Sequence, residues 1–293
     1  MDVWFTENQA SGLRISVQVT GVLERRKSSY QEIVVTETTG FGRMLTLDDV
    51  VQTTERDEFT YHEMICHVPM CAHPSPKCVL VVGGGDGGVV REVLRHGVER
   101  VDLVEIDEAV VELSKKYLPT ISSALTDPRV HVRIEDGIKA VREARSEYDV
   151  IIVDSTDPVG PAVGLFAEEF FRSIHGALRD DGIFVAQTGS PFYFAEVIGG
   201  VLAGVRKIFP RSGLYVGCVP MYPGGLWSYT VGSKVHDPSV PKRRLDAGTR
   251  YYSPEVHTAA FALPAFVKRV VEGAGLSSDG AGPATGGATG EKP

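Results

Sequence analysis

Two carboxylates close an apolar run near the middle of the chain. Asp154 and Asp157 end the segment Asp149-Val-Ile-Ile-Val-Asp-Ser-Thr-Asp-Pro158. An apolar strand of this kind delivers its last residues to the carboxyl edge of an open α/β sheet, where ligands bind. An aliphatic ammonium has a pKa near that of lysine, about 10.4, so an amine must lose a proton before it attacks near pH 7. We expect Asp154 to accept that proton and Asp157 to hold the cation. The alternative for this pair is one helix cap and one buried ion pair.

A glycine-rich turn, Gly83-Gly-Gly-Asp-Gly-Gly88, precedes these carboxylates by some 70 residues. Glycines let backbone N–H groups approach a ligand closely, and the N-terminus of the helix that follows adds a favourable dipole. Many such turns serve only close packing of a helix on a strand. Asp86 changes the interpretation, because a phosphate-binding loop would not usually place a carboxylate among its donors. The turn therefore favours a nucleoside with a positively charged appendage over a dinucleotide or ATP.

Two more acidic residues follow predicted strands. Glu105 ends the second strand, 19 residues after Asp86. At that place α/β nucleoside-binding folds put an acidic residue that accepts from the ribose hydroxyls. Asp107 is the better candidate for capping the next helix. Asp136-Gly137 follows the third strand, where a carboxylate could accept from an adenine amino group, although Asp-Gly is also a common turn. The series predicts a nucleoside pocket whose reacting end is negatively charged.

Aromatic and polar residues are further candidate liners of this pocket. Tyr61 and His62 lie on a predicted helix, and Tyr222-Pro-Gly-Gly-Leu-Trp227 is an aromatic loop between the last two strands. Tyr and Trp faces bind alkylammonium chains by cation–π contact, although aromatics at such places are more often core. The Gly/Pro-rich segment 158–166 reads as a lid that excludes water. The remaining histidines that we considered fit no ligand spacing and are expected on the surface or in the core: His67, His73, His131 and His175.

Composition narrows the class of protein. Among 293 residues, 30 are basic and 38 acidic, and the net charge of −8 argues against nucleic acid or an anionic membrane as partner. The four cysteines show no C-x-x-C spacing, which is typical of free thiols in a reducing cytosol. No segment has the roughly 20 apolar residues of a membrane span, and the N-terminus lacks the pattern of a signal peptide. We expect a cytoplasmic protein.

Periodicity predicts three regions. Residues 1–55 alternate apolar and polar side chains and are expected to form an antiparallel domain of about six strands. Residues 56–272 begin with a helix at 56–68, closed by Pro69, and continue with alternating strands and helices, which predicts a doubly wound sheet. Residues 273–293 are rich in Gly, Ala, Ser, Thr and Pro and are expected to be a disordered tail. The expected strands are 79–82, 101–105, 130–134, 150–153, 182–187 and an antiparallel pair at 214–219 and 228–231; the expected helices are 89–96, 108–117, 166–178, 196–208 and one that ends the stretch 252–271.

From Trp4 to Lys268 these features resemble the polyamine aminopropyltransferases, most closely the bacterial spermidine synthases. The resemblance is carried by a set of motifs in order: Asp57-Glu-Phe-Thr-Tyr-His-Glu-Met64, His67-Val-Pro69, Val82-Gly-Gly-Gly-Asp-Gly-Gly88, Asp154-Ser-Thr-Asp-Pro158 and Tyr222-Pro-Gly-Gly-Leu-Trp-Ser-Tyr229. It implies a small N-terminal β-domain on a class I methyltransferase-like (Rossmann-like) α/β sheet. It also implies transfer of an aminopropyl group from decarboxylated S-adenosylmethionine to putrescine, giving spermidine and 5'-methylthioadenosine. A homodimer or homotetramer built through the N-terminal domain is expected.

The resemblance also assigns residues. Asp154 matches the proton acceptor, and no metal or cofactor is implied, because a sulfonium is already an activated leaving group. The donor contacts are expected to be Gln31, Gly83, Gly84, Gly85, Asp86, Glu105, Asp136, Gly137 and Pro161. The amine contacts are expected to be Tyr61, His62, Asp86, Asp154, Ser155, Thr156, Asp157, Tyr222 and Trp227.

Three positions depart from the family pattern. Asp48-Asp49 replaces the usual Asp-Gly turn, and Gly224-Gly225 stands where Ser-Gly or Asn-Gly is commoner. Gly189-Ser190 lies where relatives often carry an acidic residue near the far end of the amine. This last change leaves agmatine, cadaverine and spermidine open as alternative acceptors. An amine N-methyltransferase and a non-catalytic polyamine or nucleoside sensor are the other hypotheses.

Overall fold

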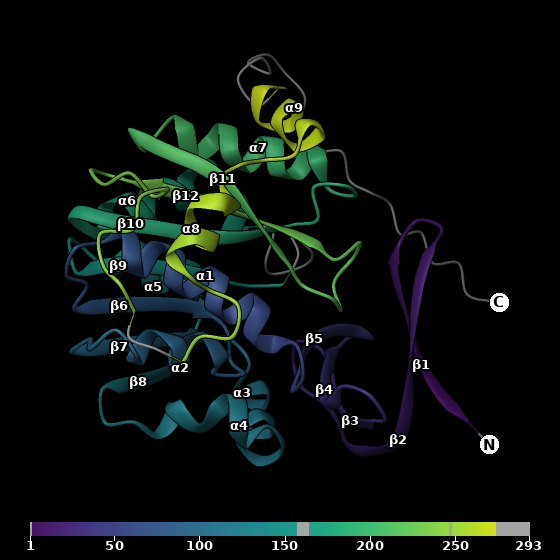
Figure 1. Cartoon of the computed structure of the whole chain (residues 1–293). Coiled ribbons are helices and arrows are strands. Elements are labelled where there is room, and N and C mark those ends of the chain that lie inside the picture. Colours follow the sequence, from purple (N-terminus) through teal and green to yellow (C-terminus); the bar gives the residue numbers. More distant parts are fainter. Residues whose placement is uncertain (1, 157–163, 246–247, 274–293) are drawn as a thin grey trace.

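Two β-sheets joined by one buried helix form the frame of the molecule. The computed structural model describes residues 2–156, 164–245 and 248–273 (Figure 1). The N-terminal sheet of the described chain is antiparallel in the order β1-β2-β3-β4-β5. Its strands are β1 Val3–Ala10, β2 Leu13–Lys27, β3 Glu32–Thr38, β4 Gly42–Leu47 and β5 Val50–Thr54.

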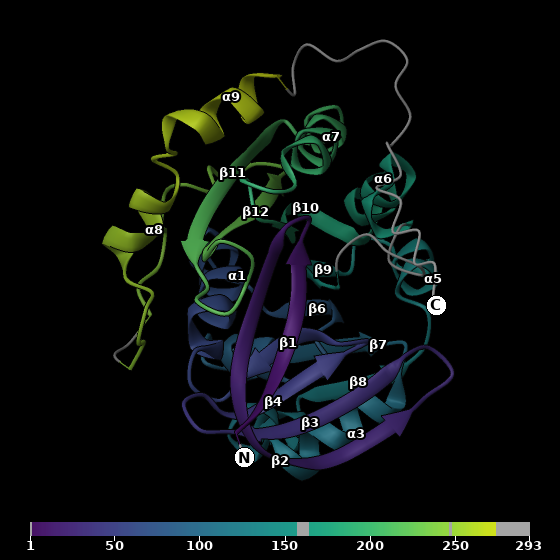
Figure 2. The same cartoon turned by 90° about the vertical axis from the view of Figure 1, so that its right-hand side faces the viewer.

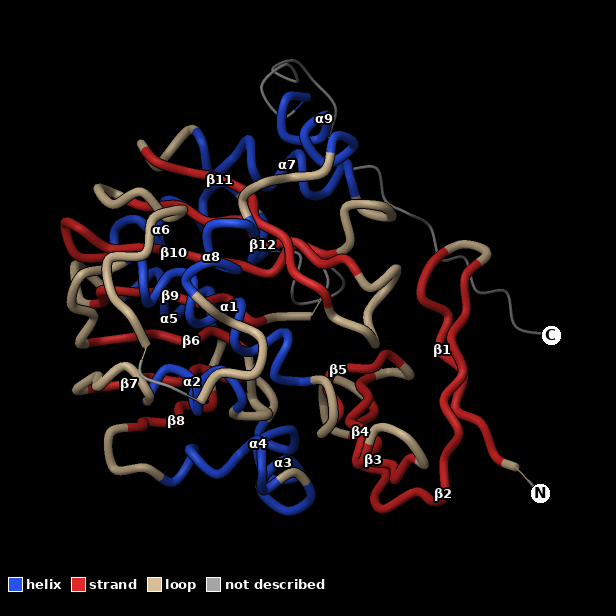
Figure 3. The backbone as a smooth tube through the Cα atoms, in the orientation of Figure 1, coloured by secondary structure: helices blue, strands red, loops and turns tan. Residues whose placement is uncertain are grey.

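The larger sheet has the order β11-β12-β10-β9-β6-β7-β8. Its strands are β6 Cys78–Gly83, β7 Arg100–Glu105, β8 Val130–Ile134, β9 Tyr148–Asp154, β10 Leu178–Gly189, β11 Arg211–Cys218 and β12 Leu226–Ser233. From β8 to β10 neighbouring strands are parallel, and β12 runs antiparallel to both β10 and β11. This confirms the predicted doubly wound α/β domain and the predicted antiparallel last pair. Figure 3 shows the two sets of strands lying apart from each other.

Helices cover both faces of the larger sheet. They are α1 Glu58–Ala72, α2 Gly88–Leu94, α3 Glu108–Tyr117, α4 Pro119–Ser122, the 3-10 turn η1 Ser123–Thr126, α5 Gly137–Glu143, α6 Glu168–Ala177, α7 Ala195–Arg206, α8 Pro254–Ala260 and α9 Ala265–Gly273. Residues of α1, α2 and α8 share one apolar core with the sheet, and residues of α5, α6 and α7 share the other. Figure 2 shows α1 and α8 on one side of the sheet and α5 and α6 on the other. None of the helices in the described part of the chain is long and apolar enough to cross a bilayer.

The N-terminal sheet packs on the larger domain through α3 and α4. Ile33 and Leu45 of that sheet are buried against Leu113 and Ile121 of these helices. Helix α1 leads directly from β5 into the larger sheet, and almost all of it is buried. The side chains at the start of α1 therefore lie where the two sheets meet.

Some expectations about the elements were wrong. The described N-terminal sheet has five strands, not about six. Pro69 lies inside α1, which continues to Ala72, where the N–H of His73 donates to the Pro69 carbonyl at 3.1 Å. A proline inside a helix costs about 3 kcal/mol or more, but burial of nearly every residue of α1 outweighs that cost. Helices α4 and α5 and the turn η1 were not predicted, because each is only four to seven residues long.

Candidate active site

The point where the strand order reverses lies between β6 and β9. There Gly83 pairs in register with Asp154, and the chain runs from β6 outward through β7 on one side and from β9 outward through β10 on the other. In open α/β sheets ligands bind in the crevice at this point, beyond the carboxyl ends of the strands. Glu105 and Asp154 are the last residues of β7 and β9, and the glycine turn begins at Gly83, the last residue of β6. The topology therefore brings the predicted residues to one edge.

The glycine turn packs tightly against Asp154. Gly83, Gly84 and Gly87 have φ of 80°, 68° and 84°, a region that L side chains rarely adopt. A Cβ on Gly84 would lie 2.8 Å from Asp154 Oδ2, and one on Gly88 would collide with the His62 ring. Glycine is therefore required at these positions by the backbone conformation and by the protein's own neighbouring atoms, in addition to any role toward a ligand.

Asp154 and Asp86 face each other across this edge. Ligand atoms of His62, Asp86 and Asp154 all lie within 4.8 Å of one another. Tyr61 Oη donates to Asp154 Oδ1 at 2.5 Å. Burial first, and then the negative charge of Asp86, raise the pKa of Asp154 to about 6, against the opposing effects of His62 and the Tyr61 hydrogen bond. A carboxylate with this pKa is mostly ionised at pH 7 and can accept a proton.

His62 lies between two carboxylates. Its Nδ1 is 2.6 Å from Glu58 Oε2, and its Nε2 is 3.3 Å from Asp86 Oδ2. Burial acts to lower the pKa of this imidazole, but Asp86 and Glu58 together raise it well above the usual value. The same cation lowers the pKa of Asp86 despite the burial of that carboxyl. Both ring nitrogens of His62 therefore face carboxylates in the structure.

Glu105 and Gln31 lie at the opposite end of the edge. Glu105 accepts from the N–H groups of Gly85 at 3.2 Å and Asp107 at 3.0 Å. Burial raises its pKa to about 7, and the nearby Asp107 charge adds to that rise. Gln31 Nε2 donates to Asp107 Oδ2 at 3.0 Å, which brings the N-terminal sheet to this end. Asp107 also accepts from the N–H of Ala109, so it caps α3 as expected.

Asp136 caps α5. Its Oδ1 accepts from the N–H of Ile138 at 2.8 Å and of Lys139 at 3.4 Å, and the side chain is exposed. A Cβ on Gly137 would collide with Val82 at the end of β6. The cap explains the Asp-Gly pair structurally, and Oδ2 makes no hydrogen bond to another residue in the part of the chain described.

The rings of Tyr61, Tyr222 and Trp227 pack together beside Asp154 and form an aromatic wall. The rings of Tyr61 and Tyr222 lie 5.6 Å apart, and Tyr222 contacts Trp227 at 4.6 Å between ring centroids. Tyr222 Oη donates to the carbonyl of Gln52 at 2.6 Å, so the N-terminal sheet also holds this wall. Trp227 is buried, and its Nε1 has no hydrogen-bond partner among the described residues.

The rim beyond Asp154 is only partly described. Ser155 accepts at its backbone carbonyl from Gln187 Nε2 at 2.9 Å, and Thr156 is exposed. Asp157, Pro161 and most of the predicted lid at 158–166 lie outside the described residues. Of the three carboxylates predicted to surround a cation, the structure thus places Asp86 and Asp154 together.

Sequence reasoning missed two residues of this site and one cluster below it. Glu58 and Arg91 hold His62, and the i,i+4 spacing of Glu58 and His62 on a helix was the available signal. Cys66, His67 and His96 also come within 4.8 Å of one another at their ligand atoms, although their spacing along the chain showed no such group. Packing of α1 on α2 brings this cluster together, and no local pattern records such packing.

Comparisons with known proteins cover nearly all of the chain. Residues 58–242 match the spermine/spermidine synthase domain, and residues 3–55 match the spermidine synthase tetramerisation domain. The polyamine aminopropyltransferase of Thermoanaerobacter sp. strain X514 is 55% identical over 279 residues, which cover 93% of this chain and 99% of the relative. That of Bacillus mycoides is 51% identical, with 93% and 100% covered.

Solved structures are similarly close. A spermidine synthase in complex with the transition state analogue AdoDATO superposes with a TM-score of 0.89 at 41% identity, covering 92% of this chain and 95% of that one. The spermidine synthase of Thermotoga maritima gives a TM-score of 0.86 at 40% identity, with 92% and 94% covered.

Proposed function

The chain belongs to the polyamine aminopropyltransferase (spermidine synthase) family, and we propose that it transfers the aminopropyl group of decarboxylated S-adenosylmethionine to putrescine. The products are spermidine and 5'-methylthioadenosine. The observation that carries the proposal is the convergence of Asp154 and Asp86 at the switch point of the sheet, with Tyr61 bound to Asp154.

The step is an in-line displacement. The lone pair of the amine nitrogen attacks the aminopropyl carbon next to the sulfonium sulfur, the C–S bond breaks, and its electron pair neutralises the sulfur. Asp154 accepts the proton that the amine loses. Its pKa of about 6, raised chiefly by burial, makes it ionised yet basic near pH 7. Alignment of the two substrates can lower the activation barrier by up to about 7–11 kcal/mol. Alignment and proton removal are therefore the two contributions that the protein has to make.

Charge supports the choice of donor. The thioadenosine end is assigned to Gln31, Gly83, Gly84, Gly85, Glu105, Asp136, Gly137 and Pro161, of which Pro161 rests on the family resemblance alone. The aminopropyl ammonium is assigned to Asp86 with His62 behind it. Intact S-adenosylmethionine carries an extra carboxylate, which would meet Asp86 and Asp154 without a positive partner. Repulsion and unpaired burial disfavour that donor.

The acceptor amine is assigned to the other side of Asp154. Tyr61, Tyr222 and Trp227 supply ring faces for its alkyl chain, and Ser155 and Thr156 directly follow Asp154. Asp157 is assigned to the acceptor on the family resemblance alone. Ser190 Oγ is buried and has no hydrogen-bond partner among the described residues. A buried hydroxyl without a partner is compatible with a role toward the far ammonium of the acceptor.

A homo-oligomer is part of the proposal. Residues 3–55 match a tetramerisation domain, and Val3 and Trp4 on β1 are 56% and 55% exposed in the single chain. Consecutive residues of a strand point to opposite faces, so these two exposed side chains are compatible with another subunit covering either face of β1. Light scattering of the purified protein, with Trp4→Ser as the interface variant, determines whether it is a dimer or a tetramer.

One assay tests the activity. Purified protein is incubated with decarboxylated or intact donor and with putrescine, cadaverine, agmatine or spermidine, and the products are identified by mass. The proposal expects spermidine and methylthioadenosine from decarboxylated donor and putrescine, with the highest kcat/KM among the four amines. A higher kcat/KM for another of the four amines would make that amine the preferred acceptor. Formation of methylated amine and S-adenosylhomocysteine would establish a methyltransferase. Binding of donor and amine without turnover would establish a sensor.

A further inference from the structure

Glu58, in the first turn of α1, connects the site to the neighbouring helix. Its Oε2 lies 2.6 Å from His62 Nδ1 and 2.7 Å from Arg91 Nη2 of α2. Glu58 is 8% exposed and His62 is 2% exposed. One carboxylate oxygen therefore fixes the ring of His62 from behind, while the front nitrogen of the ring faces Asp86.

The groups around His62 alternate in charge. Asp86 faces it from the turn after β6, Glu58 from its own helix, and Asp154 approaches from the end of β9. The only cation that contacts these groups from α2, within the described residues, is Arg91. The remaining ionisable groups nearby are two neutral tyrosines, Tyr61 and Tyr222, and the side-chain carboxyl of Asp57, the residue that precedes α1. Without a cation at His62, Asp86 and Asp154 would repel each other across a few ångströms.

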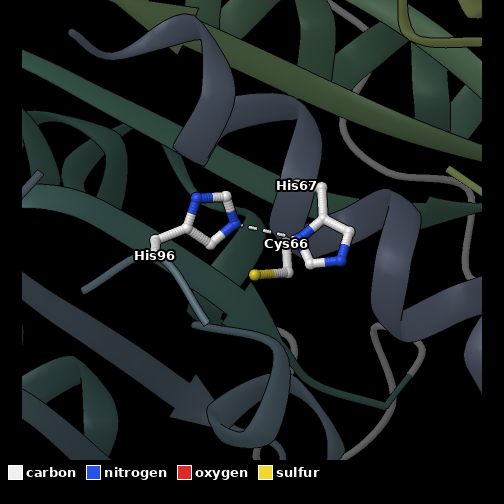
Figure 4. Close-up of side chains that lie close together, drawn as sticks. All are labelled: Cys66, His67 and His96. Atoms are coloured by element: carbon white, nitrogen blue, oxygen red, sulfur yellow. Dashed lines mark hydrogen bonds between the residues drawn. The ribbon is translucent and has the colours of Figure 1, made fainter. Parts of the chain in front are cut away.

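The network continues away from the site along α2. Arg91 Nε lies 2.9 Å from Glu92 Oε1, and Glu92 Oε2 contacts Arg95 at 2.6 Å and His67 Nε2 at 3.1 Å. The far end is the His67–His96 pair, where Nδ1 and Nε2 are 3.0 Å apart, beside Cys66 (Figure 4). Burial lowers the pKa of His96 to about 2, so the chain of charges ends on a neutral ring. Glu92 therefore holds Arg91 firmly, and Arg91 in turn holds Glu58.

We propose that Glu58, fixed by Arg91, is a positioning residue that holds the imidazolium of His62 against Asp86 and so lets Asp86 and Asp154 both remain ionised for the cationic substrates. The catalytic part of this inference rests on the proposed function. Glu58 itself touches no reacting atom, because His62 lies between it and Asp86. It acts through the charge and the orientation of the His62 ring.

The titration of His62 tests the positioning without any turnover. In the full-length protein free of substrates, NMR follows the ring protons of His62, assigned with His62→Gln. Glu58→Gln is expected to lower the pKa of His62 by about one unit or more, because one of its two opposing charges is lost. A matched control is Glu63→Gln on the same helix, since Glu63 is also buried but, among the described residues, accepts from the backbone N–H groups of Arg250, Tyr251 and Tyr252 and not from His62. An unchanged His62 titration in folded Glu58→Gln protein overturns the inference.

A double-mutant cycle tests the effect on the reaction. Glu58→Gln is expected to move the acid limb of kcat/KM to higher pH by about one unit. The reason is that a smaller protonated fraction of His62 stabilises the Asp154 carboxylate less and so raises the pKa of Asp154. In a His62→Gln background the same substitution should cause no further shift. Equal shifts in both backgrounds would mean that Glu58 acts by a route other than His62, which contradicts the inference. If the wild-type protein transfers no aminopropyl group, the proposed function fails while the NMR titration still decides the role of Glu58.

Discussion

Tyr61 Oη donates a hydrogen bond to Asp154 Oδ1 at 2.5 Å, from helix α1 to the end of strand β9. Hydrogen bonds to the charged form of a carboxylate favour that form. Tyr61→Phe is therefore expected to raise the pKa of Asp154 above about 6 and to move the acid limb of kcat/KM to higher pH. A rise of one unit lowers the ionised fraction, and with it kcat/KM below the new pKa, by up to about tenfold.

The control for this variant is Tyr229→Phe. The Tyr229 ring lies 5.9 Å from that of Tyr61 and is fully buried, but its hydroxyl has no hydrogen-bond partner among the described residues. Its removal should leave the acid limb in place. If both variants shift the limb equally, the effect comes from packing of the aromatic wall and not from the Tyr61 hydrogen bond.

The wild-type pH profile follows from Asp154. We expect kcat/KM to fall with unit slope below about pH 6, because protonated Asp154 cannot accept the proton of the amine. The loss appears on the acid side only, since this group stays ionised as the pH rises. Initial rates at low substrate concentration from pH 5 to 8 measure it. A flat profile down to pH 5 would show that another group is the base.

Asp154→Asn keeps the shape of the side chain and removes its basicity. Turnover is expected to drop by about 10²-fold or more, the usual contribution of general base catalysis. Binding of methylthioadenosine should change little, because that ligand is assigned to the Glu105 end of the edge. Isothermal titration and single-turnover assays separate the two effects. Near-wild-type turnover would refute the assigned role.

The fold was predictable because its signals are local. The apolar runs that became β6, β7 and β9 are mostly buried parallel strands, whereas β8 is the half-exposed edge strand of the sheet, and each of the four is followed by a clear turn or helix signal. Both ends of helix α3 were predicted correctly, because Asp107 caps its start and Lys115 and Lys116 lie in its last turn. The end of α1 was not, since burial of its whole length allows the helix to pass through Pro69.

The candidate site was predictable in its residue types but not in its couplings. Strand ends indicated Asp154 and Glu105, because parallel strands all deliver their last residues to one edge. The link from His62 through Glu58 to Arg91 depends on the packing of α1 on α2, which sequence periodicity does not record. The second role of Asp136 as the cap of α5 was hidden for another reason, because the helix that it caps is short.

The hairpin between β4 and β5 offers a test of backbone strain. Asp48 and Asp49 have φ of 47° and 63°, in the left-handed region that a two-residue hairpin turn requires. Asp48 Oδ1 accepts from the N–H of Glu32 at 2.8 Å, whereas the Asp49 side chain makes no hydrogen bond to any other described residue. Asp49→Gly should stabilise the protein by about 0.5–1 kcal/mol, measured by urea unfolding, with unchanged kcat. Asp48→Gly is the control and should gain less, since it loses the bond to Glu32. Lower stability of Asp49→Gly would contradict this account.

Glu105 links stability to pH. Burial, aided by the Asp107 charge, raises its pKa from about 4.5 to about 7 in the folded protein. Because the folded state binds this proton more tightly than the unfolded state, the resulting stability is fully present below pH 4.5 and is lost as the pH rises through about 7. The difference of about 2.5 units corresponds to roughly 3 kcal/mol across that window.

Glu105→Gln removes this titration. The free energy of unfolding should therefore fall less steeply between pH 5 and 7.5 in the variant than in the wild type, as measured by urea unfolding at several pH values. The same variant should bind methylthioadenosine more weakly, because an amide supplies one acceptor oxygen where the carboxylate supplies two for the ribose hydroxyls. Asp154 also has a raised pKa, so part of the slope should remain in Glu105→Gln and should be smaller still in the Glu105→Gln/Asp154→Asn double variant. An identical slope in wild type and Glu105→Gln would show that Glu105 is already ionised in the folded protein at pH 5.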